Sequence, residues 1–121
     1  MIYHSNMEKP VIYVAGAITK APGLNKQKFA LATKQLRALG YIVINPHELC
    51  DGLPPEEWKK CMRITIAKMV SDAEIIVMLD DWQESRGATI EVNIARSIEI
   101  KTVNLIDFLN EPEKYHLSKA G

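Results

Sequence analysis

The chain has 121 residues, of which 47% are hydrophobic and 25% charged, as expected for one globular domain with a sizeable core and not for a disordered chain. Lysine plus arginine equals aspartate plus glutamate at 15 each, so the formal net charge is zero. This balance argues against binding to a nucleic-acid polymer, which requires a basic surface. No stretch approaches the roughly 20 apolar residues of a membrane span.

The two cysteines, Cys50 and Cys61, are too few for a disulfide framework and lack the spacing of zinc ligands. We therefore expect both to be reduced thiols in a cytoplasmic protein. No cluster of His, Cys and Asp indicates a metal, and no cofactor is expected. Residues 1–8 resemble a flexible leader.

The first half of the chain reads as strand, loop, helix and strand. Residues 11–15 form an apolar run that predicts a buried strand, followed by a turn at Gly16. A helix is expected over 25–39, and Gly40 suits its C-terminal cap. This helix has an apolar stripe at three- and four-residue steps: Phe29, Ala32, Leu36 and Leu39. Residues 41–44 predict the second strand.

The second half continues the alternation. Residues 46–55 read as a loop, and the two prolines that end it suit the start of a helix reaching about residue 71. The inner stripe expected for that helix is Trp58, Met62, Ile66 and Met69. A strand at 74–79, a polar loop at 80–86, a helix at 87–100 and a strand at 102–106 follow. The last residues, 107–121, are weakly patterned and are a candidate for an oligomer interface.

This order predicts a single-domain doubly wound (Rossmann- or flavodoxin-like) parallel α/β sheet of about four to five strands over residues 9–106, with helices on both faces. Ligands of such folds bind beyond the carboxyl ends of the strands. Residues 16–20, 45–53 and 80–88 should therefore share the functional edge. Asp72 and Lys101 should lie at the opposite edge.

The strongest local signal starts at Asp81, passes through a strand-to-helix loop and ends at Glu91. Unpaired N–H groups at the helix start, the Ser85 hydroxyl and the small Gly87 predict an anion pocket. Ser85 can equally be a plain helix cap, and the two roles are compatible. Glu91 leans back toward the loop, where it either meets a ligand or is a surface glutamate stabilised by the helix dipole.

Four other residues have weaker claims. Trp82 can stack on a base or pack over the helix end. Lys20 can meet an anion, and His47 can act as an acid or base. Trp58 is expected in the core.

The segment S-R-G-A-T-I-E-V-N-I-A resembles the signature of the nucleoside 2-deoxyribosyltransferase-like superfamily. The preceding D-A-E-I-I-V-M-L-D-D-W-Q-E-S is similar to small phage and bacterial members, and V-I-Y-V-A-G-A-I and I-N-P also match. The resemblance implies that Glu91 is a nucleophile that attacks C1′, releases the base and leaves a glycosyl-enzyme. It also implies a homodimer or higher homo-oligomer.

Members with serine at the position of Ser85 resemble the nucleoside 5′-monophosphate N-glycosidases. The physical chemistry agrees, because a serine hydroxyl can donate a hydrogen bond to a phosphate, whereas a carboxylate would repel it. The resemblance therefore implies hydrolysis of the N-glycosidic bond of a (deoxy)nucleoside 5′-monophosphate. Transfer of deoxyribose between bases, and nucleotide binding without catalysis, remain alternatives. The residues expected to bind substrate are Gly16, Arg63, Asp81, Trp82, Ser85, Gly87 and Ala88.

One departure from the resembling proteins concerns the helix before the third strand. Many of them have an aspartate midway along it, whereas this chain has Thr65 and Ile66 there. Either another carboxylate takes the role, or the protein binds without efficient catalysis. The candidate carboxylates are Glu57, Asp80 and Asp81.

Overall fold

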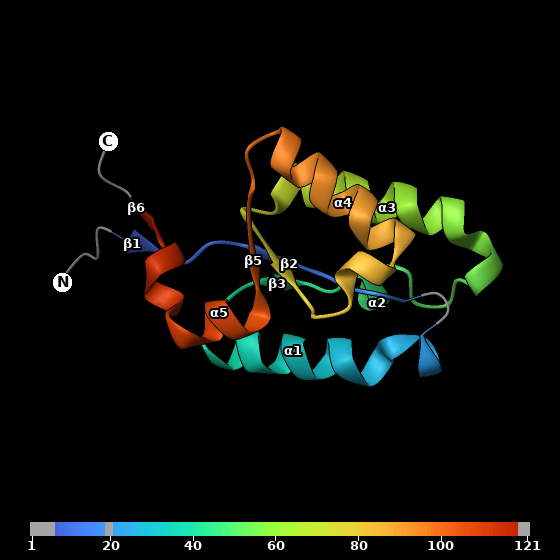
Figure 1. The fold of residues 1–121 in the computed structure, drawn as a ribbon, viewed down its shortest axis with the longest axis horizontal. Helices are drawn as coiled ribbons and strands as arrows, with labels where there is room; N and C mark the ends of the chain where they lie inside the picture. The colour runs from blue at the N-terminus through green and yellow to red at the C-terminus, as the bar shows by residue number, and fades with distance from the viewer. Residues whose placement is uncertain (1–6, 19–20, 119–121) are drawn as a thin grey trace.

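The computed structural model describes residues 7–18 and 21–118. Its centre is a parallel sheet of four strands in the order β3-β2-β4-β5. These strands are β2 (Ile12–Ala15), β3 (Val43–Ile44), β4 (Ile75–Met78) and β5 (Lys101–Asn104). Helices α1 (Lys26–Ala38) and α5 (Leu105–Asn110) lie on one side of the sheet, and α3 (Trp58–Asp72) and α4 (Arg86–Ser97) lie on the other (Figure 1). The predicted doubly wound α/β fold is confirmed.

Two short strands outside the main sheet join the ends of the described chain. β1 (Met7–Glu8) pairs antiparallel with β6 (Leu117–Ser118). The pairing places the end of the expected leader beside the end of the weakly patterned C-terminal segment. That segment contains most of α5, which begins where the sequence predicted the end of the last strand. Thr19 and Lys20 lie outside the described residues.

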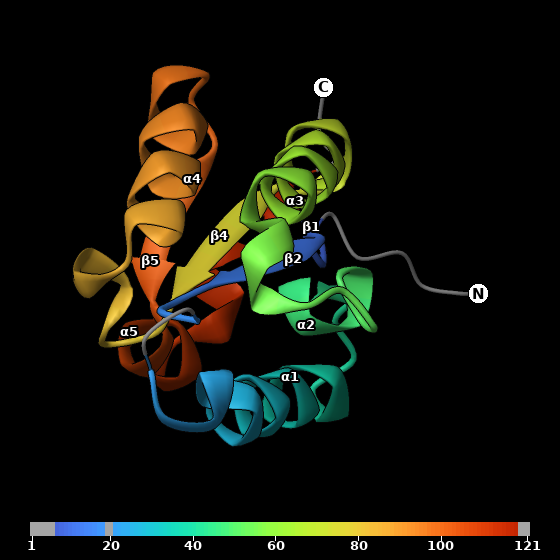
Figure 2. The same cartoon turned by 90° about the vertical axis from the view of Figure 1, so that its right-hand side faces the viewer.

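The two faces of the sheet divide the core into two layers. Successive strand residues point to opposite faces, so Ile12 and Val14 join the core beneath α1 and α5, whereas Tyr13 and Ala15 join the core beneath α3 and α4. Figure 2 shows these layers above and below the strands. All four residues of β2 are buried, because this central strand is covered on both faces. The Tyr13 hydroxyl is thereby directed between α3 and α4.

The connections create a switch point in the sheet. From β2 the chain moves to β3 on one side, and then returns past β2 to β4 on the other. The segments that follow β2, β3 and β4 therefore meet at one edge, where ligands of such sheets bind. This arrangement positions the candidate site.

Three local predictions need correction. Leu39 is exposed, because α1 ends one residue before it, although Gly40 has the expected left-handed conformation with φ of 95°. The helix predicted at 87–100 ends earlier, at Ser97, and Ile98 just beyond it is exposed. The loop predicted at 46–55 contains the short helix α2 (Pro46–Leu49), because the Asn45 side chain accepts a hydrogen bond from the His47 N–H.

Candidate functional site

A pocket opens where the segments after β2, β3 and β4 converge. The turn after β2 contributes Gly16, and the start of α1 contributes Lys26. The segment from Pro46 to Pro55 forms a long wall, while α3 and α4 form another. Three segments that the sequence predicted to share one edge of the sheet therefore each contribute to this pocket. The site residues within the lining are Gly16, Ser85, Gly87, Ala88 and Glu91.

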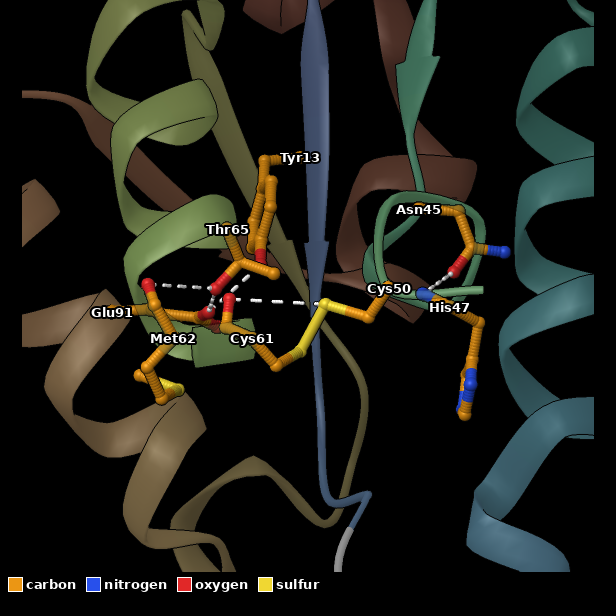
Figure 3. Close-up of a disulfide and its surroundings, with 8 residues drawn as sticks. All are labelled: Tyr13, Asn45, His47, Cys50, Cys61, Met62, Thr65 and Glu91. Atoms are coloured by element: carbon orange, nitrogen blue, oxygen red, sulfur yellow. Dashed lines mark hydrogen bonds between the residues drawn. A yellow bond between two sulfur atoms is a disulfide. The ribbon is translucent and has the colours of Figure 1, made fainter. Parts of the chain in front are cut away.

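Glu91 is a buried carboxylate in this lining, with 5% of its surface exposed. The Tyr13 hydroxyl donates to its Oε2 at 2.8 Å, and the Thr65 hydroxyl donates to the same oxygen at 2.7 Å. Figure 3 shows these two side chains converging on Glu91 from β2 and α3. Among the described residues nothing donates to Oε1. One oxygen is therefore fixed, while the other is free to react.

Burial raises the pKa of Glu91 to about 7, against an opposing effect of the hydrogen bonds from Thr65 and Tyr13. Burial and the adjacent Glu91 charge raise the pKa of Tyr13 well above its ordinary value. Tyr13 consequently stays protonated and donates, while Glu91 loses its proton near neutral pH. A carboxylate poised in this range suits nucleophilic or acid–base chemistry.

Thr65 is one of the two residues at the place where the resemblance implies an aspartate, and it is 1% exposed. Its neutral hydroxyl stabilises the ionised form of Glu91, whereas a second carboxylate at this distance would oppose ionisation. Sequence reasoning missed both Thr65 and Tyr13 as partners of Glu91. A tyrosine within a fully apolar strand was the available signal, because a buried phenol usually needs a hydrogen-bond partner.

Replacing Thr65 with valine should raise the pKa of Glu91 by about one to two units, since a hydrogen bond to a charged group contributes about 1.5–3 kcal/mol. Thr65→Ser keeps the hydroxyl and should leave the pKa near the wild-type value. Carbon-13 NMR titration of the glutamate carboxyl groups measures both variants. An unchanged pKa in Thr65→Val would show that this hydrogen bond does not control Glu91.

The start of α4 forms the end of the pocket nearest Ser85. The Ser85 Oγ accepts a hydrogen bond from the Ala88 N–H at 3.1 Å, so the predicted helix cap is confirmed. Because Oγ accepts in this bond, its own hydrogen remains free to donate into the pocket. Gly87 lies in the first turn, where helical N–H groups have no partner within the helix. The arrangement can hold an anion by hydrogen bonds and by the positive end of the helix dipole.

Two of the three glycines in the lining, Gly16 and Gly87, permit close packing. A Cβ atom at Gly16 would lie 2.8 Å from Leu79 Cδ1, which is an impossible contact without a shift. A Cβ atom at Gly87 would lie 3.0 Å from Met62 Sδ and 3.6 Å from Trp58 Nε1. The absence of a side chain at these two glycines therefore allows neighbouring elements to pack closely at the pocket edge.

Trp58, which the sequence pattern predicted to lie in the core, lines the pocket. Its ring lies beneath the Arg86 guanidinium, with 4.8 Å between the guanidinium carbon and the ring centroid. Trp82, for which the sequence left base stacking and packing over the helix end as alternatives, packs against the core beneath α3 and α4, with Arg96 5.4 Å from its ring centroid. Trp58 is consequently the better placed tryptophan to contact a ligand.

Asp81 is not part of the pocket lining and anchors the turn after β2. It accepts hydrogen bonds from the Ala17 N–H at 3.0 Å and from Asn25 Nδ2 at 2.7 Å, and pairs with Lys28. Burial acts to raise the pKa of Asp81, but these partners outweigh it and hold the pKa below its ordinary value. Its geometry supports a structural role.

Three further candidates also lie outside the pocket lining: Glu57, Arg63 and Asp80. Arg63 is exposed on α3, and Asp80 is exposed and pairs with Lys28. Glu57 is exposed just before α3. None of the carboxylates proposed as substitutes for the missing aspartate lines the pocket, and Thr65 occupies that position instead.

His47 lines the pocket beside the turn before α1. Its Nε2 lies 2.7 Å from the Leu24 carbonyl, which can only accept, so this nitrogen carries the proton. Burial lowers the pKa of His47, so the ring is neutral near pH 7. His47 thereby holds the backbone of Leu24, a non-glycine residue with a left-handed φ of 55°.

Cys50 and Cys61 are joined in a disulfide, which corrects the expectation of reduced thiols. The fold brings their Cα atoms within 5.7 Å, a normal separation for a disulfide. A spacing of 11 residues in the sequence could not indicate this proximity. Both cysteines line the pocket.

Among the residues that the structure describes, no three His, Cys, Asp or Glu side chains gather in a way that could hold a metal ion. None of the helices described has both the length and the apolar composition needed to cross a bilayer.

Comparison with proteins of curated function finds no match to this chain. Comparison with sequence families finds one profile that matches residues 10–104, a range that includes β2 through β5 and the Glu91 pocket. The matched range covers most of the 121 residues. On this match, the chain belongs to the family described as Domain of unknown function (DUF4406).

Proposed function

We propose that the protein hydrolyses the N-glycosidic bond of a (deoxy)nucleoside 5′-monophosphate through a covalent glutamyl-glycosyl intermediate. The observation that carries the proposal is the Glu91 carboxylate in the pocket lining, held through Oε2 by Tyr13 and Thr65. The resemblance of residues 85–95 to the nucleoside 2-deoxyribosyltransferase-like superfamily supports the same role.

In the proposed reaction the free oxygen of Glu91 attacks C1′ of the sugar. The bond from C1′ to the base nitrogen breaks, its electron pair leaves with the base, and a glycosyl ester forms on Glu91. Water then attacks C1′, breaks the ester and restores the carboxylate, and the proton that this water loses balances the proton that the released base takes up. Two displacements give net retention at C1′, as in retaining glycosidases. Tyr13 and Thr65 hold the second carboxylate oxygen throughout and share its charge when Glu91 leaves.

The start of α4 supplies the proposed phosphate site. The Ser85 hydroxyl and the Gly87 N–H can donate to phosphate oxygens, and Lys26 adds a positive charge to the same lining. Ser85 and Glu91 both line the pocket, and the separation of six residues between their positions corresponds to a little under two turns of α4. A sugar whose 5′-phosphate lies at Ser85 would thus have C1′ directed toward Glu91.

Ser85→Asp should reduce kcat/KM for a nucleoside monophosphate by about a hundredfold, because like charges brought together cost several kcal/mol. The aspartate can still cap α4, so the fold should persist. Activity on the matching nucleoside, with a free 5′-hydroxyl, should be retained or should rise. Parallel assays of the two substrates measure the switch, with Ser85→Thr as a control that keeps the hydroxyl. An equal loss on both substrates would contradict a phosphate at Ser85.

Nucleotide binding without catalysis is the second candidate function. The residues Thr65 and Ile66 favour it, because many of the resembling enzymes have an aspartate near this place in the helix. Transfer of deoxyribose to a second base is the closest catalytic variant. It uses the same glycosyl-enzyme, with a base instead of water as the acceptor.

Chromatographic detection of free base distinguishes these candidates. The protein is incubated with each common ribo- and deoxyribonucleoside monophosphate, with and without a second base. Release of base in water supports hydrolysis, whereas a new nucleotide formed only with the second base supports transfer. Thermal stabilisation by a nucleotide with no release supports the binding protein.

A further inference from the structure

The disulfide between Cys50 and Cys61 closes a segment that forms part of the pocket wall. Cys50 caps the end of α2, and Cys61 lies in the first turns of α3. Figure 3 shows the sulfur atoms bridging these elements beside the Glu91 cluster. Between the cysteines, the pocket is lined by Asp51, Gly52, Leu53, Pro54, Pro55 and Trp58.

This segment, which we call the 51–57 wall, has few other attachments. Its backbone hydrogen bonds are local, from Leu53 N–H to Cys50 and from Glu57 N–H to Pro54. No hydrogen bond joins the wall to a strand or to another helix within the part of the chain that the structure describes. Most of its residues are exposed, and Leu53 is only partly buried. The disulfide is therefore the main tie that restrains this wall.

The disulfide is not needed to compensate for a small core. Disulfides commonly stabilise chains below about 70–80 residues, whereas this domain has two buried apolar layers around its sheet. The bond joins two neighbouring elements at the pocket and does not reach either layer. Its effect is expected at the pocket.

We infer that Cys50–Cys61 is a reversible redox site that controls the order of the 51–57 wall and, through it, the affinity of the pocket. The control of affinity rests on the proposed function, whereas the redox site itself does not. The reductant is a dithiol or a pair of small thiols. One thiolate attacks a protein sulfur, the Sγ–Sγ bond breaks, and a mixed disulfide forms. The second thiol releases the reductant as its own disulfide. Two electrons pass to the protein, and two protons complete the thiols of Cys50 and Cys61.

Both cysteines line the pocket, so a small reductant can reach them from the same opening as a ligand. A nucleotide in the pocket should accordingly slow their reduction. When the disulfide is reduced, each binding event must order the 51–57 wall. The entropic cost of that ordering weakens binding.

The test combines thiol labelling with hydrogen exchange on the full chain. Maleimide labelling under non-reducing conditions should modify neither cysteine, and incubation with a small dithiol should expose both. Exchange measured by mass spectrometry should then become faster in peptides covering 51–57, with little change in β2 or β4. Cys50→Ser/Cys61→Ser should exchange at the reduced rate and should not respond to the dithiol. Reduction of the wild type gives the same comparison if this variant fails to fold.

Base release is measured in both redox states. Reduction should raise KM by about three- to tenfold with little effect on kcat, as expected when only the ordering of the wall is lost. Labelling of both cysteines without reductant, or identical exchange before and after reduction, would overturn the redox site. Base release that does not respond to reduction would refute control of affinity and leave the proposed function standing. Faster exchange on reduction without base release in either state would support the redox site and refute the proposed function.

Discussion

Glu91→Gln should lower the rate of base release by at least about a thousandfold, because an amide cannot form the glycosyl ester. The variant should still fold, since the amide oxygen can accept the hydrogen bonds that Tyr13 and Thr65 now donate to Oε2. Single-turnover base release at pH 8, where wild-type Glu91 is mostly ionised, measures the loss.

The matched control for this variant is Glu84→Gln. Glu84 is exposed, lies one residue before Ser85 and is absent from the pocket lining, so the same change of charge occurs beside the site without touching it. Its activity should equal that of the wild type. Thermal stabilisation of Glu91→Gln by the nucleotide would show that its pocket is intact. Base release by Glu91→Gln at the wild-type rate would exclude Glu91 as the nucleophile.

The stability of Glu91→Gln relative to the wild type should depend on pH. The folded-state pKa of about 7 lies above the ordinary value of 4.5, so the wild type is most stable with Glu91 protonated. The free energy of unfolding falls as the pH rises from about 4.5 through 7. Above pH 7 the total loss has reached about 3 kcal/mol. Glutamine is neutral at every pH. The free energy of unfolding of the variant relative to that of the wild type should therefore rise by about 3 kcal/mol between pH 4.5 and pH 8.

Urea unfolding of both proteins at pH 4.5 and pH 8 measures this effect. The relevant quantity is the change with pH in the difference between the two free energies of unfolding, because the other titrating groups are the same in both proteins. The melting temperatures should diverge by about 10 °C over the same range. A difference that stays constant with pH would mean that Glu91 does not titrate near neutrality.

Sequence patterning was sufficient for the order of the main elements and for one end of the site. The strand at Ile12–Ala15, the helix after Gly87 and the Ser85 cap depend on neighbours within a few residues. Local periodicity and capping chemistry therefore reveal them. The carboxyl-end rule for parallel sheets then placed Ser85 and Glu91 at the edge that contains the pocket.

Sequence patterning also failed at identifiable places. The short helix α2 was read as loop, because Pro46 and the glycine and prolines that follow it indicate a turn more strongly than a four-residue helix. Trp58, expected in the core, lines the pocket, whereas Trp82 packs against the core beneath α3 and α4. Both follow turn residues and precede helical ones, so the local pattern does not distinguish a pocket-facing indole from a buried one.

The sequence by itself determined the doubly wound fold and the presence of a carboxylate and a helix start at one edge. The tertiary structure decided what surrounds that carboxylate. Tyr13 and Thr65 lie 78 and 26 residues from Glu91, and both reach it only because β2 and α3 pack against α4. The disulfide likewise depends on how α2 meets α3. Periodicity in the sequence shows which side of a helix or strand is apolar. The contacts around Glu91 depend instead on which element covers that side, and only the packing of the whole chain determines this.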